Sequence, residues 1–143
     1  RYYTELVIED LSHSTLRFAM LMFDIDNFKH INNTYGHAVG DAILRDIAHL
    51  VQQTLTPDDH LGRWGGEEFI VIAKGLDEGA SLKLANRLCL SVEQHIFAID
   101  EPVTISVGLT LVQPGDQPRH LFERADQGMT LAKMAGKNQV VIC

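Results

Sequence analysis

The sequence predicts a single α+β domain, in which a central, mostly antiparallel sheet is flanked by helices. Three observations predict it: short apolar segments alternate with amphipathic ones, two strands are joined by a double glycine, and the composition is globular. The chain has 143 residues, of which 45% are hydrophobic and 22% charged, so it is long enough to bury one core. We find no internal repeat and expect residues 1–143 to be one domain of a longer protein.

Strands are predicted where apolar residues run together without helical spacing. The first, Ala19–Phe23, is apolar throughout, as expected of a strand that is covered on both faces. Leu61–Trp64 and Glu67–Ala73 predict a hairpin, because Gly65 and Gly66 between them can supply the positive φ of a tight primed turn. Two later strands are predicted at Val103–Val112 and Gln139–Ile142.

Helices are predicted where apolar residues recur every three or four positions. Three such segments are Ile43–Leu55, Ala85–Ile96 and Leu121–Ala132. Asp41 is expected to cap the first of them, which Pro57 follows, and Gly136 can terminate the last. With a helix at the start, the predicted order is helix, strand, helix, hairpin, helix, strand, helix, strand.

Charge and cysteine content narrow the classes of function. Nineteen Asp and Glu against twelve Lys and Arg leave a net charge of -7, which disfavours binding to nucleic acid, where affinity comes from neutralised phosphates. Cys89 and Cys143 lack metal-ligand spacing and are predicted to be free thiols in a reducing cytosol. Without a signal peptide or an apolar run of roughly 18 residues, we expect a cytoplasmic domain with no direct membrane contact, in a protein that could itself be anchored.

Two acidic segments interrupt the apolar pattern. Asp24 and Asp26 follow the first predicted strand, where packing needs no carboxylate and an unpaired one is costly to bury. Either they cap the helix near Phe28, or they bind a hard cation such as Mg²⁺, which prefers carboxylate, carbonyl, water and phosphate oxygens. In the second segment, Glu67 and Glu68 follow the double glycine although acids are poor strand formers, which indicates a site.

Together these segments resemble the GGDEF family of diguanylate cyclases, here with Gly-Gly-Glu-Glu-Phe as the signature. The resemblance extends over nearly the whole chain, with the spacing of its blocks intact. The matching blocks are 23–37, 40–41, Arg63, Gly65–Phe69, 105–108, 124–126, 132–133 and 136–138. The resemblance implies a fold similar to the polymerase palm and the class III nucleotide cyclases. It also implies that two GTP are condensed into cyclic di-GMP, with release of two pyrophosphates.

The resemblance assigns roles to individual residues. Asp24, the carbonyl of Ile25 and Glu67 would hold Mg²⁺ or Mn²⁺, and Glu67 would also be the general base. The substrate residues that it implies are Phe28, Lys29, Asn32, His37, Asp41, Gly66, Lys133 and Lys137. Asn32 and Asp41 would read guanine, whose N1–H and amino group can both donate to a carboxylate, and the lysines would meet the phosphates. Because each site holds one GTP, the reaction would need a two-fold symmetric homodimer.

Simpler explanations remain open for several of these residues. Lys133 and Lys137 could be cations favoured by the dipole at a helix C-terminus. Asp41 could be no more than an N-cap, and His37 could be a loop histidine. Arg63 could pair with a carboxylate or with a phosphate.

The sequence departs from the family at the product-inhibition site, which is Arg-x-x-Asp in many members. Asp59 is kept, but Thr56 replaces the Arg whose planar guanidinium would clamp the product, so we expect this site not to function. Lys137 replaces the usual Arg and keeps its charge without its bidentate geometry. Glu68 could serve a second metal or shape the turn, and Asp26 has no assigned role.

The sequence therefore predicts an active diguanylate cyclase domain, attached in the full-length protein to an upstream sensory or regulatory region. One alternative is a catalytically silent regulatory relative that binds GTP allosterically. Another is an interaction domain that dimerises and regulates a partner. The intact signature and the presence of Asp24, Asn32 and Asp41 favour the enzyme.

Overall fold

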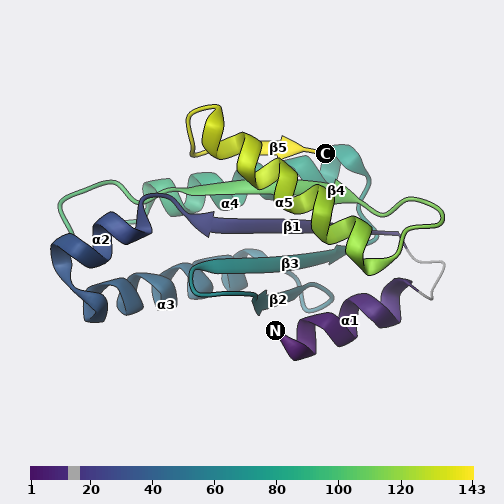
Figure 1. Ribbon diagram of the computed structural model, residues 1–143, viewed down its shortest axis with the longest axis horizontal. Coiled ribbons are helices and arrows are strands. Elements are labelled where there is room, and N and C mark those ends of the chain that lie inside the picture. The colour runs from purple at the N-terminus through teal and green to yellow at the C-terminus, as the bar shows by residue number, and fades with distance from the viewer. Residues whose placement is uncertain (13–16) are drawn as a thin grey trace.

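The computed structural model describes residues 1–12 and 17–143. Their strands form one sheet in the order β2-β3-β1-β4-β5, and helices cover both of its faces (Figure 1). The elements are α1 Tyr2–Ser12, β1 Phe18–Ile25, α2 Phe28–Tyr35, α3 His37–Thr54, β2 His60–Arg63, β3 Glu68–Lys74, α4 Glu78–Gln94, β4 Ile105–Leu111, α5 Pro118–Met134 and β5 Val140–Ile142. This arrangement confirms the predicted α+β class.

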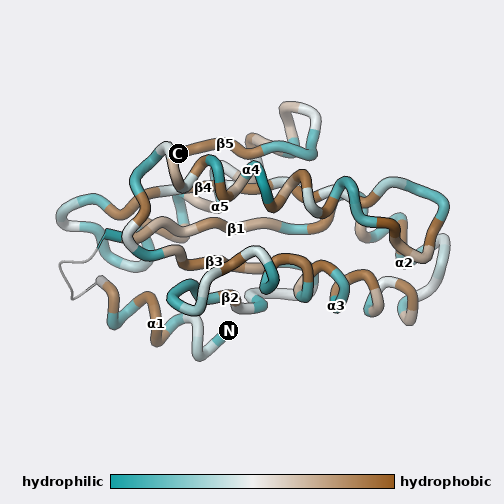
Figure 2. The backbone as a smooth tube through the Cα atoms, turned by 180° about the vertical axis from the view of Figure 1, so that it is seen from behind, coloured by the Kyte–Doolittle hydropathy of each residue, from teal (hydrophilic) through white to brown (hydrophobic). Residues whose placement is uncertain are grey.

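The central strand of the sheet is β1. It runs antiparallel to β3 on one side and to β4 on the other, while β2 is antiparallel to β3 and β5 is parallel to β4. Every residue of β1 is buried, because helices lie over both faces of the sheet, and this explains its unbroken apolar sequence. Figure 2 shows β1 from behind as a mostly hydrophobic segment.

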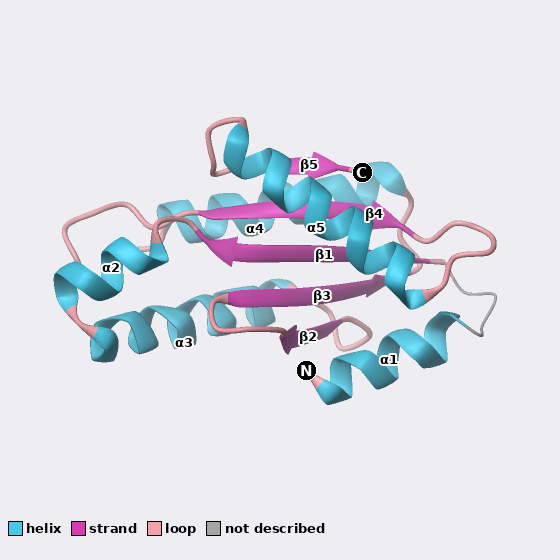
Figure 3. Cartoon of the chain, viewed as in Figure 1, coloured by secondary structure: helices cyan, strands magenta, loops and turns pink. Residues whose placement is uncertain are grey.

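Two hydrophobic cores lie on opposite faces of the sheet. Alternate side chains of a strand point to opposite faces, so Leu21 and Phe23 pack with α2, α3 and α4, whereas Met20 and Met22 pack with α1 and α5. The carboxyl end of β1 therefore lies between two helical layers. The α2–α3 pair lies near it on one side and the end of α5 on the other (Figure 3).

Helix α3 begins earlier than predicted, which changes the role of Asp41. Gly36, with φ of 90°, ends α2 and starts α3. Asp41 lies inside α3, so the prediction that it caps this helix is wrong. The cap interpretation of Asp24 and Asp26 is also wrong, because the N-cap of α2 is Asn27, which makes no side-chain cap bond. These three carboxylates are thus not explained by helix capping.

The other predicted helices and strands are confirmed with shifted ends. Helix α4 begins at Glu78 rather than Ala85, because Asp77 caps it and accepts the N–H of Ala80 at 2.7 Å. Helix α5 ends before Gly136, whose φ is 123°, as expected of a terminating glycine.

Two further predictions concern the thiols and the membrane. Cys89 and Cys143 are both free, as predicted. Cys89 faces the core from α4, and burial raises the pKa of its thiol to about 12, so this thiol stays protonated and unreactive at neutral pH. None of the described helices combines the length and apolar character needed to cross a bilayer.

Candidate active site

The hairpin between β2 and β3 brings two acidic residues to the carboxyl end of β1. The first two N–H groups after β2 donate to the carbonyl of Glu68 at 2.7 and 3.2 Å, so the main chain of Glu68 shapes the turn. Neither Gly65 nor Gly66 has a positive φ, and the predicted tight primed turn is wrong. Arg63 closes the wider loop instead, because its Nε and Nη2 donate to the carbonyl of Gly66 at 3.0 and 2.5 Å. Among the described residues, the side-chain hydrogen bonds of Arg63 go to turn carbonyls and not to a carboxylate, and its pairing with a phosphate stays a prediction.

Asp24 is the last but one residue of β1, lies on the face covered by α5 and is 5% exposed. Lys133 donates to its Oδ2 at 2.5 Å, whereas the buried Oδ1 has no hydrogen-bond partner among the described residues. Burial raises the pKa of Asp24 above its ordinary value, Lys133 lowers it, and the Glu67 and Glu68 carboxylates raise it further. A cation at the unpartnered oxygen would relieve both the burial and the repulsion, so these residues fit a bound divalent metal.

The metal site predicted from the sequence uses few protein ligands. Within the described parts of the chain, no cluster of three or more His, Cys, Asp or Glu side chains is arranged to hold a metal ion. The predicted set has two carboxylates, from Asp24 and Glu67, and one main-chain carbonyl, from Ile25. Mg²⁺ often binds in this way, because substrate phosphates and water complete its coordination.

A cavity of about 500 Å³ lies beside the hairpin and the α2–α3 pair, within the usual size of small-molecule sites. Each predicted substrate residue except Lys133 and Lys137 lines it, as does Glu67. The lining residues are Phe28, Lys29, Asn32, Asn33, His37, Asp41, Leu44, Arg63, Gly66 and Glu67. A Cβ added to Gly66 would meet nothing within 4 Å, so the backbone there is open to a ligand.

Gly40 makes room for Asn32 between α2 and α3. The Oδ1 of Asn32 is buried and has no partner among the described residues, and a Cβ on Gly40 would lie 1.8 Å from it. The sequence comparison matched Gly40 without giving it a role. A glycine inside a helix costs about 1 kcal/mol relative to alanine, but Gly40 lies before the predicted helix start at Ile43, so no pattern in the sequence indicated this contact.

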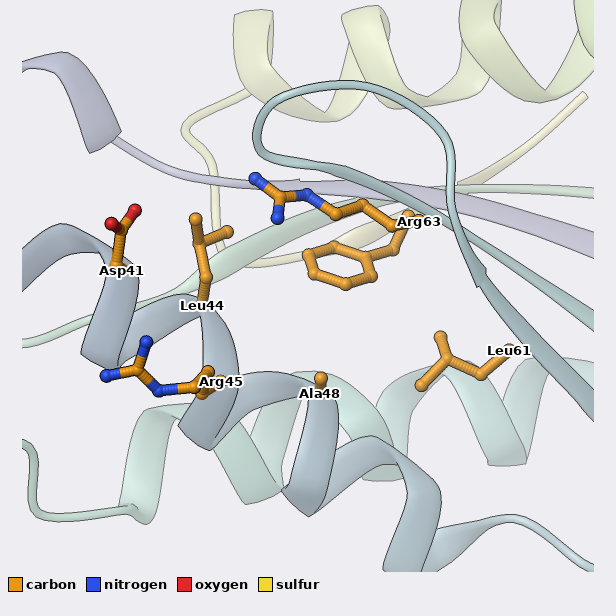
Figure 4. Close-up of a pocket in the computed structure, with 7 residues that line it drawn as sticks. Asp41, Leu44, Arg45, Ala48, Leu61 and Arg63 are labelled. Atoms are coloured by element: carbon orange, nitrogen blue, oxygen red, sulfur yellow. The ribbon is translucent and has the colours of Figure 1, made fainter. Parts of the chain in front are cut away.

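A second cavity of about 570 Å³ adjoins the first and shares Asp41, Leu44 and Arg63 with it. Figure 4 shows Arg63 reaching from the hairpin toward Leu44 and Asp41 on α3. The remaining lining residues are Arg45, Ala48, Leu61 and Phe69. Sequence reasoning had singled out none of these four for binding.

Lys133 and Lys137 lie apart from the cavity, on the α5 side of the sheet. Lys133 is in the last turn of α5, where a cation is favoured, and it also bonds Asp24. Lys137 lies beyond the helix, and its Nζ donates to Asn27 Oδ1 at 2.6 Å. The helix-dipole explanation therefore applies to Lys133 only.

The residues that match the product-inhibition site form a local turn. Asp59 Oδ2 accepts the N–H of Thr56 at 2.9 Å and its hydroxyl at 3.1 Å. The carboxylate kept from the family motif is thus bound by the residue that replaces the arginine. This is consistent with the expected loss of that site.

Comparison with known proteins identifies the family of this chain. The family model described as "Diguanylate cyclase, GGDEF domain" matches residues 2–139. The chain belongs to the GGDEF family. This GGDEF domain is 33% identical over 147 residues to the probable diguanylate cyclase DgcT of Escherichia coli (strain K12), an alignment that covers 99% of the chain and 32% of DgcT.

Two further relatives give the same family. The response regulator PleD of Caulobacter vibrioides is 39% identical over 127 residues, which cover 85% of this GGDEF domain and 28% of PleD. The domain thus spans about a third of the length of the curated relatives it matches. The active GGEEF domain of a diguanylate cyclase from Vibrio cholerae matches with a TM-score of 0.84 and 29% identity, over 98% of this chain and 89% of that one. The predicted cyclase-like fold is confirmed.

Proposed function

We propose that this GGDEF domain is the catalytic domain of a diguanylate cyclase, which condenses two GTP into cyclic di-GMP and releases two pyrophosphates. The observation that carries the proposal is that Glu67 belongs both to the cavity lined by Asn32 and Asp41 and to the acidic group around Asp24. A base-reading cavity therefore adjoins a metal-binding end of the sheet. The relative from Vibrio cholerae, which has the same GGEEF signature and is described as active, supports the proposal.

Guanine recognition is assigned to the cavity on the α2–α3 side. Phe28 and Leu44 provide apolar walls for a flat purine, and Asn32 and Asp41 provide the polar groups. The Asp41 carboxylate can accept from both N1–H and the amino group of guanine. Adenine would place an acceptor at N1 against that carboxylate, and a buried mismatch of this kind discriminates strongly. GTP is therefore the expected substrate.

Phosphate chemistry is assigned to the end of β1. Asp24, the carbonyl of Ile25 and Glu67 would hold Mg²⁺ or Mn²⁺, which when bound neutralises charge on the phosphoryl oxygens and lowers the pKa of a bound hydroxyl. Glu67 would accept the proton of the attacking 3′-hydroxyl. The hydroxyl of one GTP attacks the α-phosphorus of the other, and pyrophosphate leaves. Lys29 and the two lysines near β1 would offset its charge.

The reaction requires two copies of the domain. Each has one such cavity for GTP, so two domains must face each other with two-fold symmetry before a 3′-hydroxyl can reach the other α-phosphate. A monomer is expected to bind GTP without turnover. The rest of the longer protein, including a sensory or regulatory region, would then control activity by controlling dimerisation.

The test is incubation of the protein with GTP and Mg²⁺, with identification of the product by mass. Glu67→Ala should reduce synthesis at least about 100-fold, because metal binding and proton transfer each contribute on that order, and should leave the fold intact. Glu123→Ala, at an exposed position of α5, is the matched control. Tight GTP binding by the dimeric parent without any product would indicate a silent regulatory domain, and near-parent synthesis by Glu67→Ala would refute the role of Glu67.

A further inference from the structure

Unfavourable backbone geometry is concentrated at one point of the molecule. In the described chain, the non-glycine residues with positive φ are Asn27, Lys137 and Asn138, at 58°, 65° and 50°. Asparagine tolerates this left-handed region better than most residues, whereas lysine does not. Such geometry persists only where surrounding contacts hold it, and it is typical of functional sites. Asn27 follows shortly after β1, and the other two residues lie in the loop between α5 and β5.

Asp26 provides the contacts that hold this point together. It is 4% exposed, and its Oδ1 accepts the hydroxyl of Ser106 at 2.6 Å. Its Oδ2 accepts the hydroxyl of Thr104 at 2.7 Å and the main-chain N–H of Asn138 at 3.1 Å. A buried carboxylate is costly unless it is bonded in this way. Asp26 therefore uses both oxygens to tie the end of β1 to β4 and to the loop after α5.

A second set of bonds surrounds Lys137. Its Nζ donates to Asn27 Oδ1 at 2.6 Å, and its N–H donates to the carbonyl of Ala132 at 2.9 Å. The side-chain amide of Asn138 bonds Glu93 of α4. Residues 26–27 and 137–138 thus form a two-point connection, which we call the clasp.

We propose that Asp26 is a positioning residue, which acts through the clasp to hold Lys137 and the end of α5 beside Asp24. This inference rests on the proposed function, in which Lys133 and Lys137 meet the triphosphate. The Nζ of Lys133 already lies 2.5 Å from the Oδ2 of Asp24. The clasp holds the loop that begins where α5, the helix of Lys133, ends. Asp26 thereby aligns the phosphate-binding side of the site without touching the substrate.

A carboxylate suits this position better than its amide. The hydroxyls of Thr104 and Ser106 can donate or accept, but the main-chain N–H of Asn138 can only donate. Asp26→Asn retains one acceptor oxygen for the N–H of Asn138 and replaces the second carboxylate oxygen by an NH₂ group, which donates. Asp26→Ala retains none, so it opens the clasp at its buried end.

The experiment compares Asp26→Ala, Lys137→Ala and the double variant by calorimetry. The ligands are guanosine and a GTP analogue with a methylene between the α- and β-phosphates. We expect each single change to weaken the analogue on the order of tenfold and to leave guanosine within about twofold. Because both changes act through Lys137, the double variant should be little weaker than Lys137→Ala alone.

Two further variants distinguish positioning from a general structural role. Thr104→Val removes one hydroxyl and keeps the bond to Asn138, so both affinities should stay at the parent level. Asp26→Asn preserves the fold and should show the pattern of Asp26→Ala with a smaller loss. Hydrogen exchange of the Asn138 amide should accelerate in Asp26→Ala and not in Thr104→Val.

Two results would overturn the inference. One is that Asp26→Ala weakens binding of guanosine as much as binding of the analogue. The other is that, in the double variant, the loss of analogue affinity caused by Asp26→Ala adds fully to the loss caused by Lys137→Ala. Synthesis of cyclic di-GMP by the parent is measured separately. A parent that binds the analogue but makes no product would refute the proposed catalysis while leaving the clasp supported or refuted by its own data.

Discussion

Substituting Gly40 with alanine tests whether Asn32 reads the base. The new Cβ would lie 1.8 Å from Asn32 Oδ1 and 3.3 Å from Phe28 Cζ. The Asn32 amide is the end of a flexible side chain, so it is expected to rotate out of its buried position. Loss of its contact with guanine should cost about 1–3 kcal/mol, which corresponds to roughly 5- to 150-fold weaker binding of GTP.

The fold should survive this substitution. Alanine gains up to about 1 kcal/mol over glycine inside a helix, while crowding in a packed interior typically costs about 1–3 kcal/mol. The two terms largely offset each other, so we expect a stability change of no more than about 2 kcal/mol. The weaker binding can then be attributed to the site and not to unfolding.

The assay is calorimetry with the methylene-bridged analogues of GTP and ATP, together with thermal unfolding. Gly79→Ala is the matched control, because its Cβ would lie 3.6 Å from Asp77 Oδ1, an ordinary contact, at an exposed position of α4. It should keep the parent affinity. The assignment of Asn32 fails if Gly40→Ala binds the GTP analogue as tightly as the parent, or if the ATP analogue weakens by the same factor.

Three further predictions rest on other contacts in the structure. Thr56→Arg should introduce inhibition of initial rates by low-micromolar cyclic di-GMP, because it restores the guanidinium beside Asp59 and removes the hydroxyl bond to it; rates without inhibition in both forms would refute this. Gly108→Ala should lower the melting temperature by roughly 5–10 °C, because its Cβ would lie 1.9 Å from a backbone oxygen of α5; an unchanged melting curve would contradict this contact. Lys133→Met should destabilise the protein at pH 7 and not in acid. Burial raises the pKa of Asp24 and Lys133 lowers it. Without the lysine the pKa of Asp24 rises further, so the variant loses stability as the pH rises through that pKa. A loss of stability relative to the parent that does not shrink on acidification would refute the ion pair.

Much of the fold could be predicted because its signals are local and periodic. The apolar segment of β1, the hairpin strands and the amphipathic stripes of α3, α4 and α5 each reflect burial on one or two faces. Helix ends were predicted less well. Gly36 ends α2 and also starts α3, so the apolar stripe from Ile43 onward gave no indication that the helix begins at His37.

The same distinction between local and distant signals applies to the candidate site. Most of the cavity residues were predicted because they match a family signature, and the structure brings them together around Asn32 and Asp41. Leu44 was not predicted, because it looks like any other residue of an apolar helix stripe. The contacts of Asp26 were not predictable, because its partners Thr104, Ser106 and Asn138 lie about eighty or more positions away. A pattern within one segment cannot show which distant donors will satisfy a buried carboxylate.

The two cores of the sheet have a consequence for how nucleotide preference can change. Under the proposed function, the base is read from α2 and α3 over one face, and the triphosphate is handled by Lys133 from α5 over the other, together with Lys29 of α2. Residues that share no contacts usually contribute independently. The identity of the nucleobase can therefore be rewritten within one layer, by selection or by design, while the catalytic chemistry carried by the other layer and the strand ends is inherited unchanged.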